Sequence, residues 1–316
     1  MKKTTESGIF SYQKLEKEYA KFVQKEHVVT CNTGTAALHL ALLAFGIKKG
    51  DEVIVPDFAM AAIGFAVSYT GAKVVTVDCK DDLNINERLI EKKITKKTKA
   101  IIAVHTYGRL CNMKAIGKIA KKHGLFVLED ACEAQGIPAS EFADITAYSF
   151  YKNKIVHAEE GGAVCTNVAE FADYCRYLKN MAFDENHTYF HETIGFNYRM
   201  SDAQAKLALE SLKEVKKNMR KRRLIEKWYD ENLDCGRKIQ RDAVWVYDCV
   251  GNPDNVIENV PGSRHFFSPL STMPMWKQEV GQRALTISKK GFYLPVHPSM
   301  SKKDVVKIAN MVKSLV

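Results

Sequence analysis

The sequence predicts an α/β protein with a mostly parallel central sheet, helices on both faces of that sheet, and a small C-terminal α+β domain. Two observations predict this class. Short apolar runs alternate with amphipathic segments up to Met200, an order typical of parallel strands joined by helices. A long helical stretch then begins near Ser201, and the sequence after it is more irregular.

The first elements are expected in a regular order along the chain. Apolar residues at helical spacing predict a helix over residues 12–24, and a short strand follows at 27–31. A helix that opens with a glycine then ends near Gly46. Further strands are predicted at 52–55, 74–78, 100–104, 125–129, 145–150 and 163–166, with a helix between two of them at 113–123.

The change of pattern near Ser201 predicts the domain organisation. Ser201 or Asp202 is a suitable cap for the long helical stretch, and a last helix is predicted at 302–315. The 316 residues are enough for one large and one smaller domain. We therefore expect a large domain over residues 1–215 and a small domain over residues 216–316, joined by a long helix from about 201 to 232.

Composition argues against several classes of protein. No apolar run approaches the ~20 residues that span a bilayer, and the N-terminal segment lacks the apolar core of a secretory signal. The eight cysteines are scattered without a CxxC pair, so we expect a cytoplasmic protein with no bound metal and no membrane contact. The net charge of +10 comes mostly from lysine-rich helix faces. Only "KKNMRKRR" is dense enough to suggest nucleic acid, and it lacks interleaved aromatic residues.

Polar residues follow several of the predicted strands, where open α/β sheets bind ligands. Gly34 and Thr35 open a helix whose N–H groups favour a phosphate, although a glycine there suits an ordinary turn equally well. Asp130 closes the strand "LFVLED", where it either caps the next helix or faces a heterocyclic cation. Ser149 lies near the end of another strand, and Lys154 follows it in "AYSFYKNK".

Together these residues describe a site for pyridoxal 5'-phosphate (PLP). Lys154 would bond the cofactor's aldehyde, and Asp130 would keep the pyridine nitrogen protonated. The hydroxyl of Ser149 and the N–H groups of the helix that begins at Gly34 would hold the phosphate. A lysine at the end of an apolar strand is then explained, because burial favours the neutral, nucleophilic amine. His157, just past the lysine, is a candidate contact for substrate or phosphate.

The sequence resembles the sugar aminotransferases of the DegT/DnrJ/StrS family. The matching segments cover most of the chain in the family's order, among them "TGTAALHLAL", "GDEVIVPDF", "GAKVVTVD", "TKAIIAVHTYG", "VLEDACEAQG", "AYSFYKNK", "EEGGAVCTN", "FNYRMSDAQAKLAL", "SRHFFSPLSTMP" and "YLPVHPSMS". The resemblance implies the fold-type-I architecture of PLP aminotransferases. Within the group, it is strongest to perosamine synthase-like 4-aminotransferases.

The resemblance implies a role for each matching residue. Lys154 stands at the position of the lysine that bonds the cofactor, whereas Lys152 occupies a variable position. Asp130 pairs with the pyridine nitrogen, and Glu133 lies near the ring hydroxyl. Met60 stands where the family places an aromatic side chain on the ring, and a thioether covers a ring less broadly. The phosphate is bound by Gly34, Thr35 and Ser149.

The resemblance also implies a homodimer with shared active sites. Asn197 of "FNYRM" would contact the phosphate in the neighbouring subunit's site, and Arg199 would serve the same interface. Two departures are expected. The segment before the first helix is shorter than in the family, and the C-terminal domain is abbreviated between "AVWVYD" and "PGSRHFF".

The implied reaction is a transamination, because a PLP branch that removes a sugar hydroxyl has histidine at the position of Lys154. The implied donor is L-glutamate, and the implied acceptor is a keto-sugar on a nucleoside diphosphate, a 4-keto-6-deoxyhexose in the perosamine synthase type. The product would be an amino sugar for surface glycans. Two alternatives stay open: a PLP-dependent dehydratase or degenerate homologue, and a basic nucleic-acid-binding protein.

Overall fold

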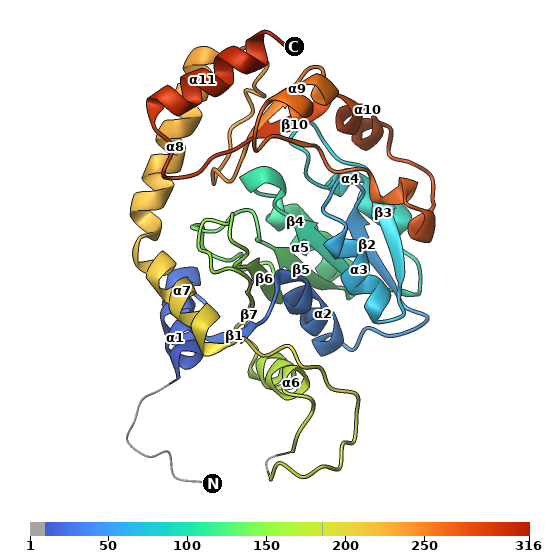
Figure 1. Cartoon of the computed structure of the whole chain (residues 1–316). Coiled ribbons are helices and arrows are strands. Elements are labelled where there is room, and N and C mark those ends of the chain that lie inside the picture. The colour runs from blue at the N-terminus through green and yellow to red at the C-terminus, as the bar shows by residue number, and fades with distance from the viewer. Residues whose placement is uncertain (1–9, 185) are drawn as a thin grey trace.

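The computed structural model describes residues 10–184 and 186–316. Its main feature is a seven-stranded sheet in the order β1-β7-β6-β5-β4-β2-β3 (Figure 1). Neighbouring strands from β6 to β3 are parallel, and β7 alone runs antiparallel to both of its neighbours. The predicted, mostly parallel sheet is therefore confirmed. The strands are β1 (His27–Cys31), β2 (Glu52–Pro56), β3 (Lys73–Val77), β4 (Thr98–Val104), β5 (Phe126–Asp130), β6 (Ile145–Ser149) and β7 (Gly162–Thr166).

Helices cover both faces of this sheet, as predicted. One face packs against α2 (Gly34–Ala44), α3 (Ala62–Tyr69) and α6 (Ala169–Lys179). The opposite face packs against α1 (Ser11–Val23), α4 (Glu87–Ile90), α5 (Met113–His123) and α7 (Asp202–Lys213). Because both faces are buried, a strand such as β2 is apolar almost throughout rather than alternating.

The long helix expected over 201–232 is instead two helices. Ser201 caps α7 as predicted, because its side chain accepts a hydrogen bond from the N–H of Gln204. At Glu214 the backbone takes φ −91° and ψ 0°, and its N–H bonds the carbonyl of Ser211, one residue closer than in an α-helix. The chain then continues as α8 (Val215–Asn232). The domain boundary predicted at residue 215 falls at this junction and remains a prediction.

The C-terminal region carries a second, smaller sheet that the sequence did not predict strand by strand. It is antiparallel, in the order β8-β10-β9, with β8 (Tyr247–Val250), β9 (Arg264–His265) and β10 (Gly291–Leu294). The helices around it are α9 (Pro253–Asn259), α10 (Gln282–Lys290) and α11 (Lys302–Lys313), of which α11 was predicted. Figure 1 shows α11 lying along α8, and the two share one apolar core. None of the helices in the described ranges is long and apolar enough to cross a membrane.

Candidate active site

A cavity of about 830 Å³ lies at the carboxyl ends of β4, β5 and β6, between the large sheet and the small C-terminal sheet. This is the edge at which open α/β sheets bind ligands. The cavity brings together seven of the residues predicted from the sequence: Gly34, Thr35, Met60, Asp130, Glu133, Ser149 and Lys154.

The N-terminus of α2 forms one end of the cavity. The Thr33 side chain caps the helix by accepting a hydrogen bond from the N–H of Ala36 at 3.0 Å. The N–H groups of Gly34 and Thr35 lie in the same first turn, which has no carbonyl one turn back to bond them. A Cβ on Gly34 would lie 2.7 Å from the Cβ of Ser149, so only glycine allows this approach. The N–H groups of Gly34 and Thr35 and the hydroxyl of Ser149 form a cradle that fits a phosphate.

Asp130 ends β5 inside the cavity and is buried. Its Oδ1 accepts a hydrogen bond from the N–H of Cys132 at 2.9 Å. Burial raises the pKa of this carboxyl, although the Cys132 hydrogen bonds and the Lys154 charge oppose the shift. A protonated ring nitrogen placed here would supply the positive partner that a buried carboxylate requires. The residue therefore fits the pyridine end of PLP.

Lys154 is buried in the same cavity, between a carboxylate and an indole ring. Its Nζ lies 3.9 Å from Oε1 of Glu133 and 3.8 Å from the centre of the Trp245 ring. Trp245 comes from the C-terminal region, and sequence reasoning assigned it no role. Its position in the apolar run "AVWVYD" was the only available signal. An amine held at such a place can bond an aldehyde within the cavity.

Three predicted residues lie outside the cavity lining. Asn197 is exposed, and its backbone forms a bridge with Asn180. Arg199 is exposed too and donates from Nη1 to Oδ1 of Asn180 at 3.2 Å. His157 turns toward α7, where its Nδ1 lies 3.1 Å from the hydroxyl of Ser211. Within one subunit, these side chains therefore do not reach the predicted cofactor site.

The C-terminal region supplies a second wall of the cavity that the sequence reasoning did not identify. Arg264 and His265 of β9 line it together with aromatic and aliphatic side chains: Ile257, Phe267 and Tyr293. The segment "SRHFFSPLSTMP" contributed to the family resemblance, but neither charged residue was given a role. This wall adds the cation of Arg264 to the cavity lining, so the lining has a second group that suits an anion besides the N-terminus of α2.

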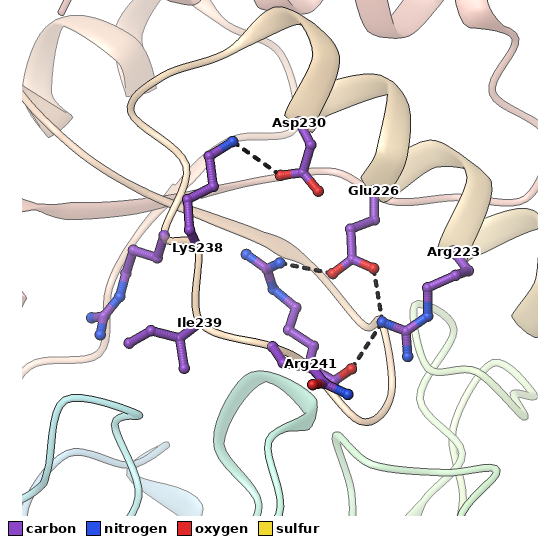
Figure 2. A pocket seen from close by; sticks show the side chains of 8 residues that line it. Arg223, Glu226, Asp230, Lys238, Ile239 and Arg241 are labelled. Atoms are coloured by element: carbon purple, nitrogen blue, oxygen red, sulfur yellow. Dashed lines mark hydrogen bonds and ion pairs between the residues drawn. The ribbon is translucent and has the colours of Figure 1, made fainter.

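A second, smaller pocket of about 250 Å³ lies beside α8 (Figure 2). Its charged side chains pair with one another: Glu226 with Arg223 and Arg241, and Asp230 with Lys238. Arg241 also pairs with the buried Asp248. These ion pairs brace the C-terminal region, and none of the site residues predicted from the sequence lines this pocket.

Comparisons with known proteins agree with this geometry. A sequence model of the "DegT/DnrJ/EryC1/StrS aminotransferase family" matches residues 3–245. A GDP-perosamine synthase of Escherichia coli O157:H7 is 33% identical over 324 residues, covering 95% of this chain and 88% of the relative. The crystal structure of DesV from S. venezuelae in complex with a ketimine intermediate superposes with a TM-score of 0.88 at 28% identity, covering 98% of this chain and 91% of that one. A structure of NtdA from Bacillus subtilis with bound cofactor PMP gives a TM-score of 0.86 at 26% identity, with coverages of 97% and 78%.

Proposed function

The chain belongs to the DegT/DnrJ/EryC1/StrS aminotransferase family, and we propose that it transfers the amino group of L-glutamate to a nucleotide-linked 4-keto-6-deoxyhexose. It is a PLP-dependent sugar aminotransferase; the donor, the sugar and the surface-glycan role of the product belong to the proposal. One observation supports it above all. A single cavity gathers a helix-end anion cradle, a buried carboxylate and a buried lysine at the ends of parallel strands.

Different residues of the cavity would bind different parts of PLP. In our proposal Gly34, Thr35 and Ser149 bind its phosphate, and Asp130 faces its ring nitrogen. Glu133 lies near the ring hydroxyl, and Met60 covers part of one ring face, although 54% of this side chain is exposed. When bound, PLP supplies an electron sink that stabilises negative charge on the carbon next to the amino group.

Lys154 carries the proton in the proposed reaction. Its Nζ would hold the cofactor through the aldehyde, and while the amine is free it would take and return a proton as base and acid. The contacts with Glu133 and Trp245 hold the amine inside the cavity while it is free. A mobile surface lysine would lack this fixed position, which is why we assign the role to Lys154 rather than to the exposed Lys152.

The outer wall supports an anionic acceptor. Arg264 lies in an exposed strand that lines the cavity, and a guanidinium binds phosphate oxygens in a bidentate manner. Both proposed substrates are anionic, since glutamate carries carboxylates and the sugar carries a diphosphate. Arg264 is therefore our candidate to bind the anionic group of either substrate.

We further propose a homodimer in which Asn197 and Arg199 complete the partner's site. Large apolar side chains near them are exposed in the single chain: Tyr189 by 92%, Phe190 by 76% and Ile194 by 80%. Figure 1 shows the connection between α6 and α7 extending away from the body of the subunit. Apolar groups exposed this far favour burial against another surface. A second copy would bury them and would bring both polar residues to a phosphate.

The alternative functions fit the structure less well. A dehydratase of this family has histidine where Lys154 stands, and the amine lies in the cavity here. The basic segment proposed for nucleic acid is not a free surface throughout, because Arg222 is buried. Nucleic-acid contacts require exposed cations that reach phosphates.

The test is an assay of the purified PLP-loaded protein with L-glutamate and nucleotide-linked 4-keto- and 3-keto-sugars. We expect an amino sugar, and 2-oxoglutarate in excess of one equivalent per subunit, only with the 4-keto acceptor; mass spectrometry identifies both products. Amination of the 3-keto sugar alone would contradict the choice of carbon, and loss of a hydroxyl without nitrogen gain would favour the dehydratase. A protein that stays colourless with PLP and retards DNA would contradict the proposal as a whole.

A further inference from the structure

Arg222 of α8 is buried with only 2% of its surface exposed, yet it contacts the loop that carries Lys154. Its Nη1 donates to the carbonyls of Trp245 at 3.0 Å and Val296 at 2.7 Å. Its Nη2 donates to the carbonyls of Asn153 and Lys154, both at 3.4 Å. One side chain therefore ties the lysine loop to two segments of the C-terminal region.

Trp245 also contacts the loop that carries Lys154. Its Nε1 donates to the carbonyl of Asn153 at 3.2 Å, and its ring lies against the amine of Lys154. The Asn153 carbonyl thus accepts from both Arg222 and Trp245. The position of the amine over the indole follows from these hydrogen bonds, because they fix the backbone on both sides of the contact.

In the part of the chain that the structure describes, the guanidinium of Arg222 donates to backbone carbonyls and to no carboxylate. A buried charge without a counter-charge is unfavourable, and burial lowers the pKa of this guanidinium to about 10. The carbonyl oxygens are what stabilise it. Only arginine offers enough N–H groups in a fixed plane to bond four carbonyls at once.

We propose that Arg222 is a positioning residue for Lys154, holding the lysine loop and Trp245 as one unit so that the amine is placed to bond the cofactor's aldehyde. This rests on the proposed role of Lys154. The bonding step joins the amine nitrogen to the aldehyde carbon and releases water. Arg222 touches neither reacting atom and acts only through the backbone it holds.

The test separates covalent attachment from binding. PLP is added to the cofactor-free protein, the C=N bond is reduced with borohydride at timed intervals, and peptide mass spectrometry measures the modified fraction of Lys154. Binding without attachment is measured with pyridoxine 5'-phosphate, which has no aldehyde. The variants are Arg222→Met, Arg222→Lys and, as a matched control, Arg223→Met. Arg223 is the next residue of α8, and its guanidinium donates hydrogen bonds to the carbonyls of Arg241 and Asp242 instead of to the lysine loop.

We expect Arg222→Met to attach PLP at least about tenfold more slowly, as loss of hydrogen bonds from a charged donor implies, while pyridoxine 5'-phosphate binds within about twofold of wild type. Arg222→Lys should recover part of the rate, and Arg223→Met should attach at the wild-type rate. Wild-type attachment in Arg222→Met would overturn the proposal, as would an equal loss of attachment and binding. If Arg222→Met does not fold, the attachment rate of Arg222→Lys is the test: a rate below wild type supports the proposal, and the wild-type rate overturns it. A wild-type protein that does not attach PLP at Lys154 would instead contradict the proposed function.

Discussion

Oε1 of Glu133 lies 3.9 Å from the Nζ of Lys154, and both side chains are buried. The other carboxyl oxygen of Glu133 accepts a hydrogen bond from the N–H of Tyr107 at 2.8 Å. Burial raises the pKa of Glu133 from 4.5 to about 7, although Lys154 and the Tyr107 N–H oppose the shift. This carboxyl therefore titrates near neutral pH in the cofactor-free protein.

The first prediction concerns stability. Because the folded protein holds the Glu133 proton more tightly than the unfolded chain, this group favours folding most below pH 4.5 and loses that contribution as the pH rises to about 7. Glu133→Gln should remove a slope of up to about 1.4 kcal/mol per pH unit across this window. Urea unfolding of the cofactor-free protein between pH 4.5 and 7.5 measures it. Equal slopes in variant and wild type would show that Glu133 is ionised throughout.

The second prediction concerns the choice between the two lysines. Lys154→Ala should lose covalent attachment of PLP and all turnover while keeping its melting temperature within a few degrees. Lys152→Ala is the matched control, because this side chain is exposed two residues away, and it should behave as wild type. The reverse result would move the assignment to Lys152.

The third prediction concerns Asp130. Asp130→Asn should lower turnover by about a hundredfold or more, at about 1.4 kcal/mol of barrier for each factor of ten, because an amide cannot hold the ring nitrogen protonated. PLP should also leave this protein during gel filtration, as followed by the visible absorption band. Full activity with retained colour would mean that Asp130 only accepts the N–H of Cys132.

The fourth prediction concerns the cradle. Gly34→Ala should destabilise the protein by roughly 1–3 kcal/mol, because the new methyl group has to displace the side chain of Ser149. It should also weaken the binding of pyridoxine 5'-phosphate more than that of phosphate-free pyridoxine. Calorimetric titration with both ligands checks this. Unchanged affinity for the phosphorylated ligand would place the phosphate elsewhere.

The fifth prediction concerns the proposed dimer. Neither Lys154→Ala nor Asn197→Ala homodimers should turn over at the wild-type rate. In a mixed dimer one site has both residues intact, so mixing the two proteins should restore part of the activity. Subunit exchange is verified with differently tagged chains. No recovery after demonstrated exchange would exclude a site that shares Asn197.

Sequence reasoning located the large sheet because each of its strands is a short, continuous apolar run, and the cofactor residues follow those runs directly. It missed Arg222 because "KKNMRKRR" reads as a solvated run of charge. The helical spacing held a signal, since Arg222 precedes the buried Ile225 and Tyr229 by three and seven positions. Helical spacing could not have identified Trp245, because its contact with Lys154 joins residues 91 positions apart in the sequence.

Because β1 pairs with β7, the large sheet can be completed only late in the synthesis of the chain. His27 pairs with Thr166, so the first strand of the chain finds its place only after more than half of the chain has left the ribosome. Closing so long a loop is entropically unfavourable and slow. Gly162 of β7 lies against the carbonyl of Thr33, where a Cβ would approach to 2.4 Å. A nascent chain released before β7 would therefore have no finished phosphate cradle, and truncated translation products of this protein should be unable to retain the cofactor.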